Sequence, residues 1–281
     1  MKFNFFTLGG SQFWEDVFFY QKWRIQRHYR SKRYRLLDNW DIQRATGGFE
    51  DCRKAFVKLI EAYEIPRQTG ELVVLLHGLG ESKSIFKPLW RYLTEKGYNV
   101  AALNYPSTKK PMRHIIRQLE FFLTHSEDAA KVSFITKGAG CLLLRNVISN
   151  TYGWQDKFRL NRIVNVNPIN CGSDTFDLMS RFKIFNFILG PMLSEASPFN
   201  AKSISKIPPD IDLGLVFCDT LGKRLINPII EKFKGVTLKN EVTEKNFSDK
   251  HINIKCNKFN LFNNEEVLRA CENFIANGSF E

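Results

Sequence analysis

Short apolar runs alternate with helical amphipathic patterns over most of the chain. The run LVVLLH at 72–77 is continuous, which is typical of a strand buried on both faces of a parallel sheet. Further runs of this kind occur at 99–105, 131–136, 162–167 and 212–218. Apolar residues at helical spacing separate them, as in Phe86, Leu89, Trp90 and Leu93. The alternation predicts an α/β fold with a mainly parallel sheet and helices on both of its faces.

The first 45 residues follow another pattern. The pieces KWRIQRH and RYRLLD alternate apolar and polar residues around YRSK, which predicts a β-hairpin with one basic face. Apolar residues from Phe49 to Tyr63 then recur every three or four positions, as in an amphipathic helix. We interpret residues 1–45 as a basic, aromatic N-terminal arm and residues 46–281 as the main α/β domain.

Composition adds a basic charge to this picture. The 281 residues include 41 Lys and Arg against 29 Asp and Glu, which gives a net charge of +12. Such an excess favours acidic proteins, RNA or anionic lipid as partners. Seven cations and no acid fall within the hairpin, and they are the candidate partner-binding residues: Lys22, Arg24, Arg27, Arg30, Lys32, Arg33 and Arg35. The arm is interpreted as a solvated face, a docking arm or an uncleaved organelle-targeting segment.

Cysteine spacing and the apolar runs bear on location. The six cysteines are scattered without C-x-x-C spacing, so we expect free thiols in a reducing compartment and no metal site or other cofactor. The apolar stretch at 184–193 is too short to cross a membrane, and the N-terminus has no secretory pattern. An intracellular protein is expected, with mitochondria as one hypothesis. Glu15 and Asp16 count against a transit peptide, because such peptides are poor in acids.

Four motifs follow the predicted strands, where α/β proteins collect their functional groups. They are HGLGES (77–82), NYPST (104–108), TKGAGC (136–141) and NPINCGSD (167–174). In this order they make the chain, from about Leu72 to Phe280, resemble the α/β-hydrolase fold family and its bacterial esterase/lipase-like members. The resemblance implies a nucleophile elbow of the form G-x-S-x-G, followed by an acid and a histidine.

The chain departs from that pattern at each member of the triad. On alignment with the family, Gly138 takes the place of the nucleophilic serine and Lys258 that of the general base. Lys239 falls at the acid position, and Asp219, directly after a strand, is the alternative acid. His251 begins the last strand, too far away to replace the base. Since the triad acts as a unit, its loss predicts a catalytically inactive protein.

The backbone of the site is expected to persist. The resemblance places the oxyanion-hole N–H groups at Leu79 and Ala139, with His77 orienting the first of these loops. Cys141 is three residues past the nucleophile position, so we expect its thiol to pack between helix and sheet. Ser82 and Ser84 are expected at the surface, where they would cap the next helix.

We therefore carry three hypotheses of function. The first is an inactive hydrolase-fold protein that serves as a structural or interaction subunit of a larger assembly. The second is an esterase or lipase with a displaced nucleophile, and the third is an acyl- or lipid-binding protein. The apolar segment from Phe176 to Leu193 is interpreted either as core or lid packing, or as a surface for lipid or another subunit.

Overall fold

The computed structural model describes residues 12–67, 70–126, 129–150, 153–219, 244–256 and 260–281. Within them, a six-stranded sheet has the order β10-β9-β8-β7-β5-β6, and every neighbouring pair is parallel. Its strands are β5 (Glu71–Leu76), β6 (Asn99–Leu103), β7 (Lys131–Lys137), β8 (Arg159–Val166), β9 (Asp212–Asp219) and β10 (His251–Lys255). The five apolar runs of the sequence all form strands of this sheet, which confirms the predicted fold class.

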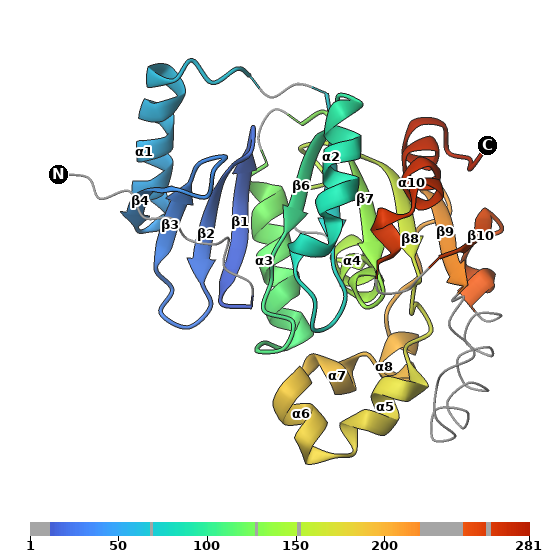
Figure 1. The fold of residues 1–281 in the computed structure, drawn as a ribbon. Coiled ribbons are helices and arrows are strands. Elements are labelled where there is room, and N and C mark those ends of the chain that lie inside the picture. Colours follow the sequence, from blue (N-terminus) through green and yellow to red (C-terminus); the bar gives the residue numbers. More distant parts are fainter. Residues whose placement is uncertain (1–11, 68–69, 127–128, 151–152, 220–243, 257–259) are drawn as a thin grey trace.

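Helices cover both faces of the sheet (Figure 1). Val73 and Leu75 of β5 face one apolar cluster, whereas Leu72, Val74 and Leu76 face another. The first cluster includes residues of α2 (Lys87–Glu95), preceded by η1 (Lys83–Phe86), and of α10 (Glu265–Asn277), preceded by η3 (Leu261–Asn263). The second includes residues of α3 (Met112–Thr124) and α4 (Gly140–Ser149). The continuous apolar run of β5 thus supplies two cores, because alternate side chains point to opposite faces.

The N-terminal arm forms a second, antiparallel sheet. Its strands, in spatial order, are β1 (Trp14–Tyr20), β2 (Trp23–His28), β3 (Tyr34–Leu37) and β4 (Gln43–Gly47). β2 and β3 pair antiparallel, with Arg27 opposite Tyr34, so the predicted hairpin is confirmed. Helix α1 (Phe49–Ala62), which the predicted division placed in the main domain, packs Cys52 and Phe56 against the apolar side of this sheet.

The two sheets meet where β1 lies beside β6 (Figure 1). Asp16 N–H donates to Asn104 O at 3.0 Å, and Asn104 N–H donates to the Asp16 carboxylate at 2.7 Å. Gln118 on α3 closes the junction by donating to the backbone oxygens of both residues at 2.8 Å. The antiparallel sheet therefore covers the β6 edge of the parallel sheet, which would otherwise expose unpaired backbone groups.

Four short helices lie together beyond the carboxyl ends of the strands (Figure 1). They are α5 (Asp174–Ser180), α6 (Lys183–Leu189), α7 (Met192–Glu195) and α8 (Pro198–Lys202), and a 3-10 turn, η2 (Lys245–Phe247), precedes β10. Met192 and Leu193 are buried in the core, as expected for packing. The apolar residues around α6 are instead exposed, to 84% for Phe187, and include Phe182, Ile184 and Ile188. No helix in the described part of the chain is both long and apolar enough to cross a bilayer.

Candidate functional site

The turn from β7 into α4 forms the centre of the candidate site. Gly138 occupies this turn with φ of +52°, a left-handed conformation that favours glycine, and its N–H donates to Val166 O at 3.1 Å. A Cβ at position 138 would meet Gly78 Cα at 3.9 Å, which is ordinary contact. The strand–turn–helix geometry is that of a nucleophile elbow. Position 138 therefore has room for a Cβ, but its glycine has no side chain.

Gly140 explains how tightly the elbow is packed. A Cβ at this position would lie 2.6 Å from the backbone oxygen of Leu76, the last residue of β5, and 3.0 Å from that of His77, the next residue. The first turn of α4 therefore touches the end of β5 directly. This contact brings Ala139, at the start of α4, next to the loop that carries Leu79. The two loops predicted to form the oxyanion hole are adjacent in the structure.

An internal carboxylate occupies this junction. One oxygen of Glu81 accepts a hydrogen bond from Gly78 N–H at 2.9 Å, and the other pairs with Lys137 Nζ. Glu81 Oε2 would be only 2.8 Å from a Cβ on Gly78, so the carboxylate lies close over the loop. A charged side chain of the protein thus lies on the backbone N–H of Gly78, one residue before Leu79. Sequence reasoning missed Glu81, since nothing in the HGLGES motif shows which way its side chain turns.

His77 is structural, as the resemblance implied. Its ring is fully buried, stacks on Tyr105 at 3.9 Å between ring centroids, and has Nδ1 2.8 Å from Gly78 O. Tyr105 Oη donates to His77 O on the same loop. Burial lowers the pKa of His77 to about 4, so the ring is neutral at physiological pH. His77 therefore orients the loop and carries no charge.

The candidate replacements for the serine have other roles or lie elsewhere in the fold. Cys141 is buried at the start of α4, where burial raises the pKa of its thiol well above the usual range. The hydroxyls of Ser82 and Ser84 bond each other at 2.7 Å, and Ser84 is exposed. Ser31 contacts His28 at 3.0 Å, but this pair is on the β2–β3 turn of the other sheet.

The remaining triad positions lie toward the C-terminus. Lys239 and Lys258 are outside the described residues. Asp219 is the last residue of β9, in register with Lys255 on β10. His251 begins β10 and is therefore at the amino end of its strand, opposite to the end that carries Gly138. It does not reach the elbow.

A buried arginine ties the α5–α8 segment to α4, and no sequence pattern predicted it. Arg145 on α4 is 2% exposed and donates to backbone oxygens of four residues: Asn170, Ala201, Ile204 and Ser205. Nearby, Glu244 is buried and accepts from Cys171 N–H at 2.6 Å. Burial raises the pKa of Glu244. These contacts fix the start and end of the α5–α8 segment.

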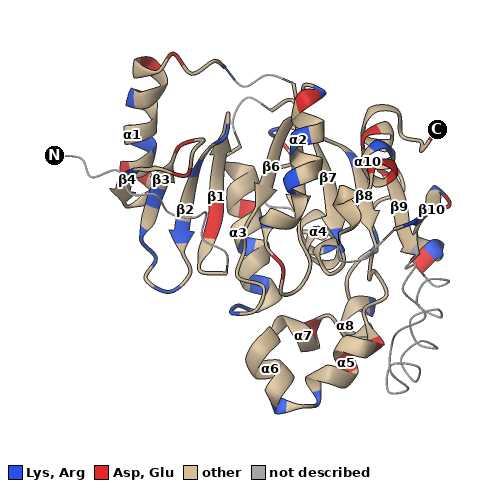
Figure 2. Cartoon of the chain, in the orientation of Figure 1, with Lys and Arg blue, Asp and Glu red and all other residues tan. Residues whose placement is uncertain are grey.

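Three of the seven basic residues of the arm are engaged inside the protein. Arg24 pairs with Asp41 and lies 3.7 Å from Asp16, and Arg27 pairs with Glu15 at 2.6 Å. Arg35 is buried, stacks 3.7 Å over the Trp14 ring and donates to the side chain of Gln26. Figure 2 shows acidic residues of β1 beside basic residues of β2. The exposed members of the set are Lys22, Arg30, Lys32 and Arg33.

Comparison with known proteins gives structural neighbours only. No family model and no curated protein matches the chain. Among solved structures, polyneuridine aldehyde esterase is similar at 14% identity, with 74% of this chain and 99% of that chain covered and a TM-score of 0.48. The Paleococcus ferrophilus monoacylglycerol lipase is similar at 15% identity, 74% and 95% coverage and a TM-score of 0.47. Potato (Solanum tuberosum) epoxide hydrolase I is similar at 11% identity, with 74% of this chain and 93% of that chain covered and a TM-score of 0.48. These values assign no activity to this chain.

Proposed function

We propose that the chain is a catalytically inactive protein of the α/β-hydrolase type that serves as an interaction subunit of a larger assembly. The observation that carries the proposal is Gly138 at the elbow. The turn keeps the left-handed backbone and the close packing of Gly140 on β5, while the attacking side chain is missing. A fold that keeps the scaffold of a site and loses its nucleophile has no route to an acyl-enzyme intermediate.

The surroundings of Gly138 support the same conclusion. The Glu81 carboxylate lies at Gly78 N–H, where it would repel the negative charge that develops on a substrate oxygen. Lys137, the other residue beside the elbow, is paired with that carboxylate. The neutral, buried His77 points its Nδ1 at Gly78 O, so it is not placed to act as a base.

Exposed groups support a role in binding. The residues around α6 present large apolar side chains to solvent, which are uncommon on a protein surface unless a partner covers them. Arg30, Lys32 and Arg33 on the β2–β3 turn form an exposed basic tip. An acidic protein surface would match that tip, and a mitochondrial assembly is the location we propose.

Ester turnover tests the inactive state. The purified full chain is mixed with short-chain nitrophenyl esters and, separately, with a fluorophosphonate probe. We expect hydrolysis at the rate of buffer alone and no change in intact mass. Turnover or labelling that is lost on replacing one Ser or Cys, with Cys141→Ala and Ser82→Ala as the first variants, would establish the esterase alternative instead.

Recovery of the untagged protein from its native source tests the subunit role. We expect it to elute with a larger complex, and the charge-reversed variant Lys32→Glu/Arg33→Glu to elute mainly as free chain. The matched control Lys54→Glu/Lys58→Glu reverses the same charge on exposed positions of α1 and should remain in the complex. A monodisperse monomer with no partner would contradict this role, and a co-purifying acyl ligand in native mass spectrometry would favour the third hypothesis.

A further inference from the structure

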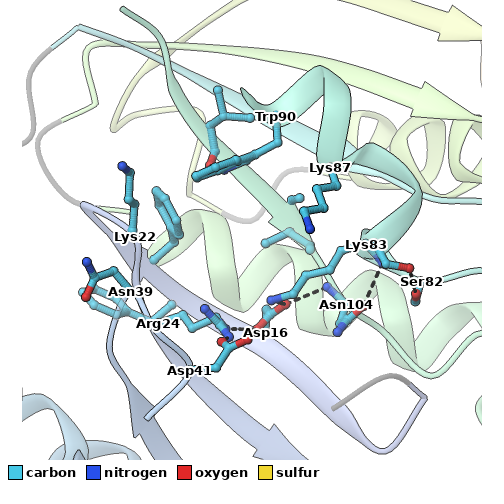
Figure 3. A pocket seen from close by; sticks show the side chains of 16 residues that line it. Asp16, Lys22, Arg24, Asn39, Asp41, Ser82, Lys83, Lys87, Trp90 and Asn104 are labelled. Atoms are coloured by element: carbon cyan, nitrogen blue, oxygen red, sulfur yellow. Dashed lines mark hydrogen bonds and ion pairs between the residues drawn. The ribbon is translucent and has the colours of Figure 1, made fainter. Parts of the chain in front are cut away.

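A cavity of about 620 Å³ lies where the two sheets join (Figure 3). Residues of β1 and β2 line it on one side, and residues of η1, α2 and β6 line it on the other. It contains neither Gly138 nor Glu81. Its volume falls in the range of small-molecule sites, and such sites commonly lie between two structural units.

The floor of this cavity is polar and already neutralised. Asp16 is 2% exposed and accepts hydrogen bonds from Gln26 Nε2 and from Asn104 N–H, both at 2.7 Å. Lys83 Nζ lies 3.3 Å from the same carboxylate. Arg24 is shared between Asp16 and Asp41, the second carboxylate of the cavity. Both acids therefore have a cation beside them, and the floor has no charge left to bind a cationic ligand.

The rim has an excess of positive charge around an aromatic wall. Lys22 and Lys87 are exposed, and Figure 3 shows them on either side of Trp90. Lys22 Nζ lies 5.5 Å above the Trp90 ring, which is held in place by a 3.0 Å hydrogen bond from its Nε1 to Val100 O. Within the described residues neither lysine forms an ion pair with a carboxylate. The cavity thus combines a fixed indole face with two cations that no carboxylate of the described residues neutralises.

We propose that this cavity binds an amphipathic organic anion, with its apolar or aromatic body against Trp90 and its carboxylate or phosphate held by Lys22 and Lys87. The apolar wall of Trp90, Phe19 and Val100 supplies contact for the body. The anionic group offsets the repulsion among four cations that face only two carboxylates. A neutral ligand would leave that repulsion in place, and a bare inorganic anion would leave the indole uncovered.

Four probes separate the contribution of the aromatic body from that of the anionic group. The full chain is titrated with 1-naphthyl phosphate, 1-naphthoate, neutral 1-naphthol and inorganic phosphate by isothermal calorimetry. We expect both naphthyl anions to bind, and 1-naphthol and inorganic phosphate to bind about tenfold more weakly or worse. The tighter of the two naphthyl anions identifies the preferred head group. Affinity for both should fall as salt is added, because the lysines are exposed.

Point variants locate the binding. Lys22→Ala and Lys87→Ala should each lower the affinity for the naphthyl anions about fivefold. Lys58 is an exposed lysine on α1, away from the cavity, and Lys58→Ala should leave the affinity unchanged. Trp90→Phe, which keeps an aromatic ring, should weaken binding less than Trp90→Ala, and unfolding curves identify any variant that fails to fold. Equal affinity for 1-naphthol, unchanged binding in both lysine variants, or no binding at all would overturn the proposal. These results are independent of the ester and partner experiments.

Discussion

Lys137 and Glu81 form an ion pair directly beside the turn that holds Gly138. Lys137 is the last residue of strand β7, whereas Glu81 lies in the loop after β5. The second Glu81 oxygen remains bonded to Gly78 N–H. This pair therefore ties the loop after β5 to the end of β7 beside Gly138.

Replacing Glu81 tests how much this ion pair and the hydrogen bond to Gly78 contribute to stability. Glu81→Ala removes both the ion pair and the acceptor for Gly78 N–H, and we expect a loss of about 1–2 kcal/mol in the free energy of unfolding. Lys137→Met removes only the partly exposed pair and should cost less than about 1 kcal/mol. Urea unfolding of both single variants and the double variant gives the coupling energy. A Glu81→Ala variant as stable as Lys137→Met would show that the hydrogen bond to Gly78 contributes nothing.

The two glycines of the elbow make a matched pair. Gly138→Ala meets no crowding but must adopt φ of +52°, which costs about 1–2 kcal/mol. Gly140→Ala drives a methyl group to 2.6 Å from Leu76 O, and because backbone cannot yield like a side chain we expect a loss of about 3 kcal/mol or more. Thermal and urea unfolding compare them. If Gly138→Ala lost more stability than Gly140→Ala, the inference that a side chain fits at position 138 would be wrong.

Position 138 also allows a direct test of the missing chemistry. Gly138→Ser should fold, with a stability close to that of Gly138→Ala, since a hydroxyl fits the same space. It should still show no turnover of nitrophenyl esters, because neither His77 nor His251 is placed to take its proton. Esterase activity in this single variant would mean that a working base lies within reach of the elbow.

Arg145 anchors the α5–α8 segment through backbone oxygens at both of its ends. Arg145→Met keeps much of the volume but leaves several carbonyl groups unpaired, and we expect a loss of about 3–5 kcal/mol. Arg145→Lys should be destabilised almost as much, since an ammonium group cannot reproduce the several hydrogen bonds of the planar guanidinium. Hydrogen exchange over residues 170–205 measures the effect. Protection there should fall more than in β5 and β7, and uniform loss would contradict the anchoring role.

The sequence predicted the parts of this fold that local pattern controls. The run at 72–77 is continuous because β5 is buried on both faces, and the hairpin of β2 and β3 shows clear alternation. β1 was not predicted, because it carries Glu15 and Asp16 at buried positions. Burial of these acids depends on partners distant in sequence, such as His114 and Lys83, which pattern alone does not show.

Only part of the candidate site could be predicted from the sequence, for the same reason. Gly138 could be placed from its motif, because the glycine spacing of an elbow reflects backbone geometry. The contact between Glu81 and Lys137 could not, since it depends on how the end of β7 packs against a loop 56 positions earlier in the chain. Likewise, seven cations without a neighbouring acid suggested a free basic face, yet Arg24 and Arg27 find their carboxylates on other segments.

Two buried groups shift the pH dependence of stability in opposite directions. Burial raises the pKa of Glu120 to about 7, and Glu120 Oε1 has no hydrogen-bond partner in the described part of the chain. The folded state therefore holds this proton more tightly, and stability falls as pH rises from 4.5 to 7. Burial lowers the pKa of His77 to about 4. The unfolded state then takes up this proton first, and stability falls as pH drops from 6.5 to 4.

Two variants separate these effects. Glu120→Gln should gain stability relative to the parent as pH rises from 4.5 to 7, by about 2–3 kcal/mol in total, because about 1.4 kcal/mol corresponds to each pKa unit. His77→Asn should gain relative to the parent by a similar amount as pH falls from 6.5 to 4. Urea unfolding at half-unit steps from pH 4 to 8 gives both difference curves. A flat curve for Glu120→Gln would show that solvent reaches that carboxyl, and a flat curve for His77→Asn would show that its ring is protonated in the folded state as easily as in the unfolded one.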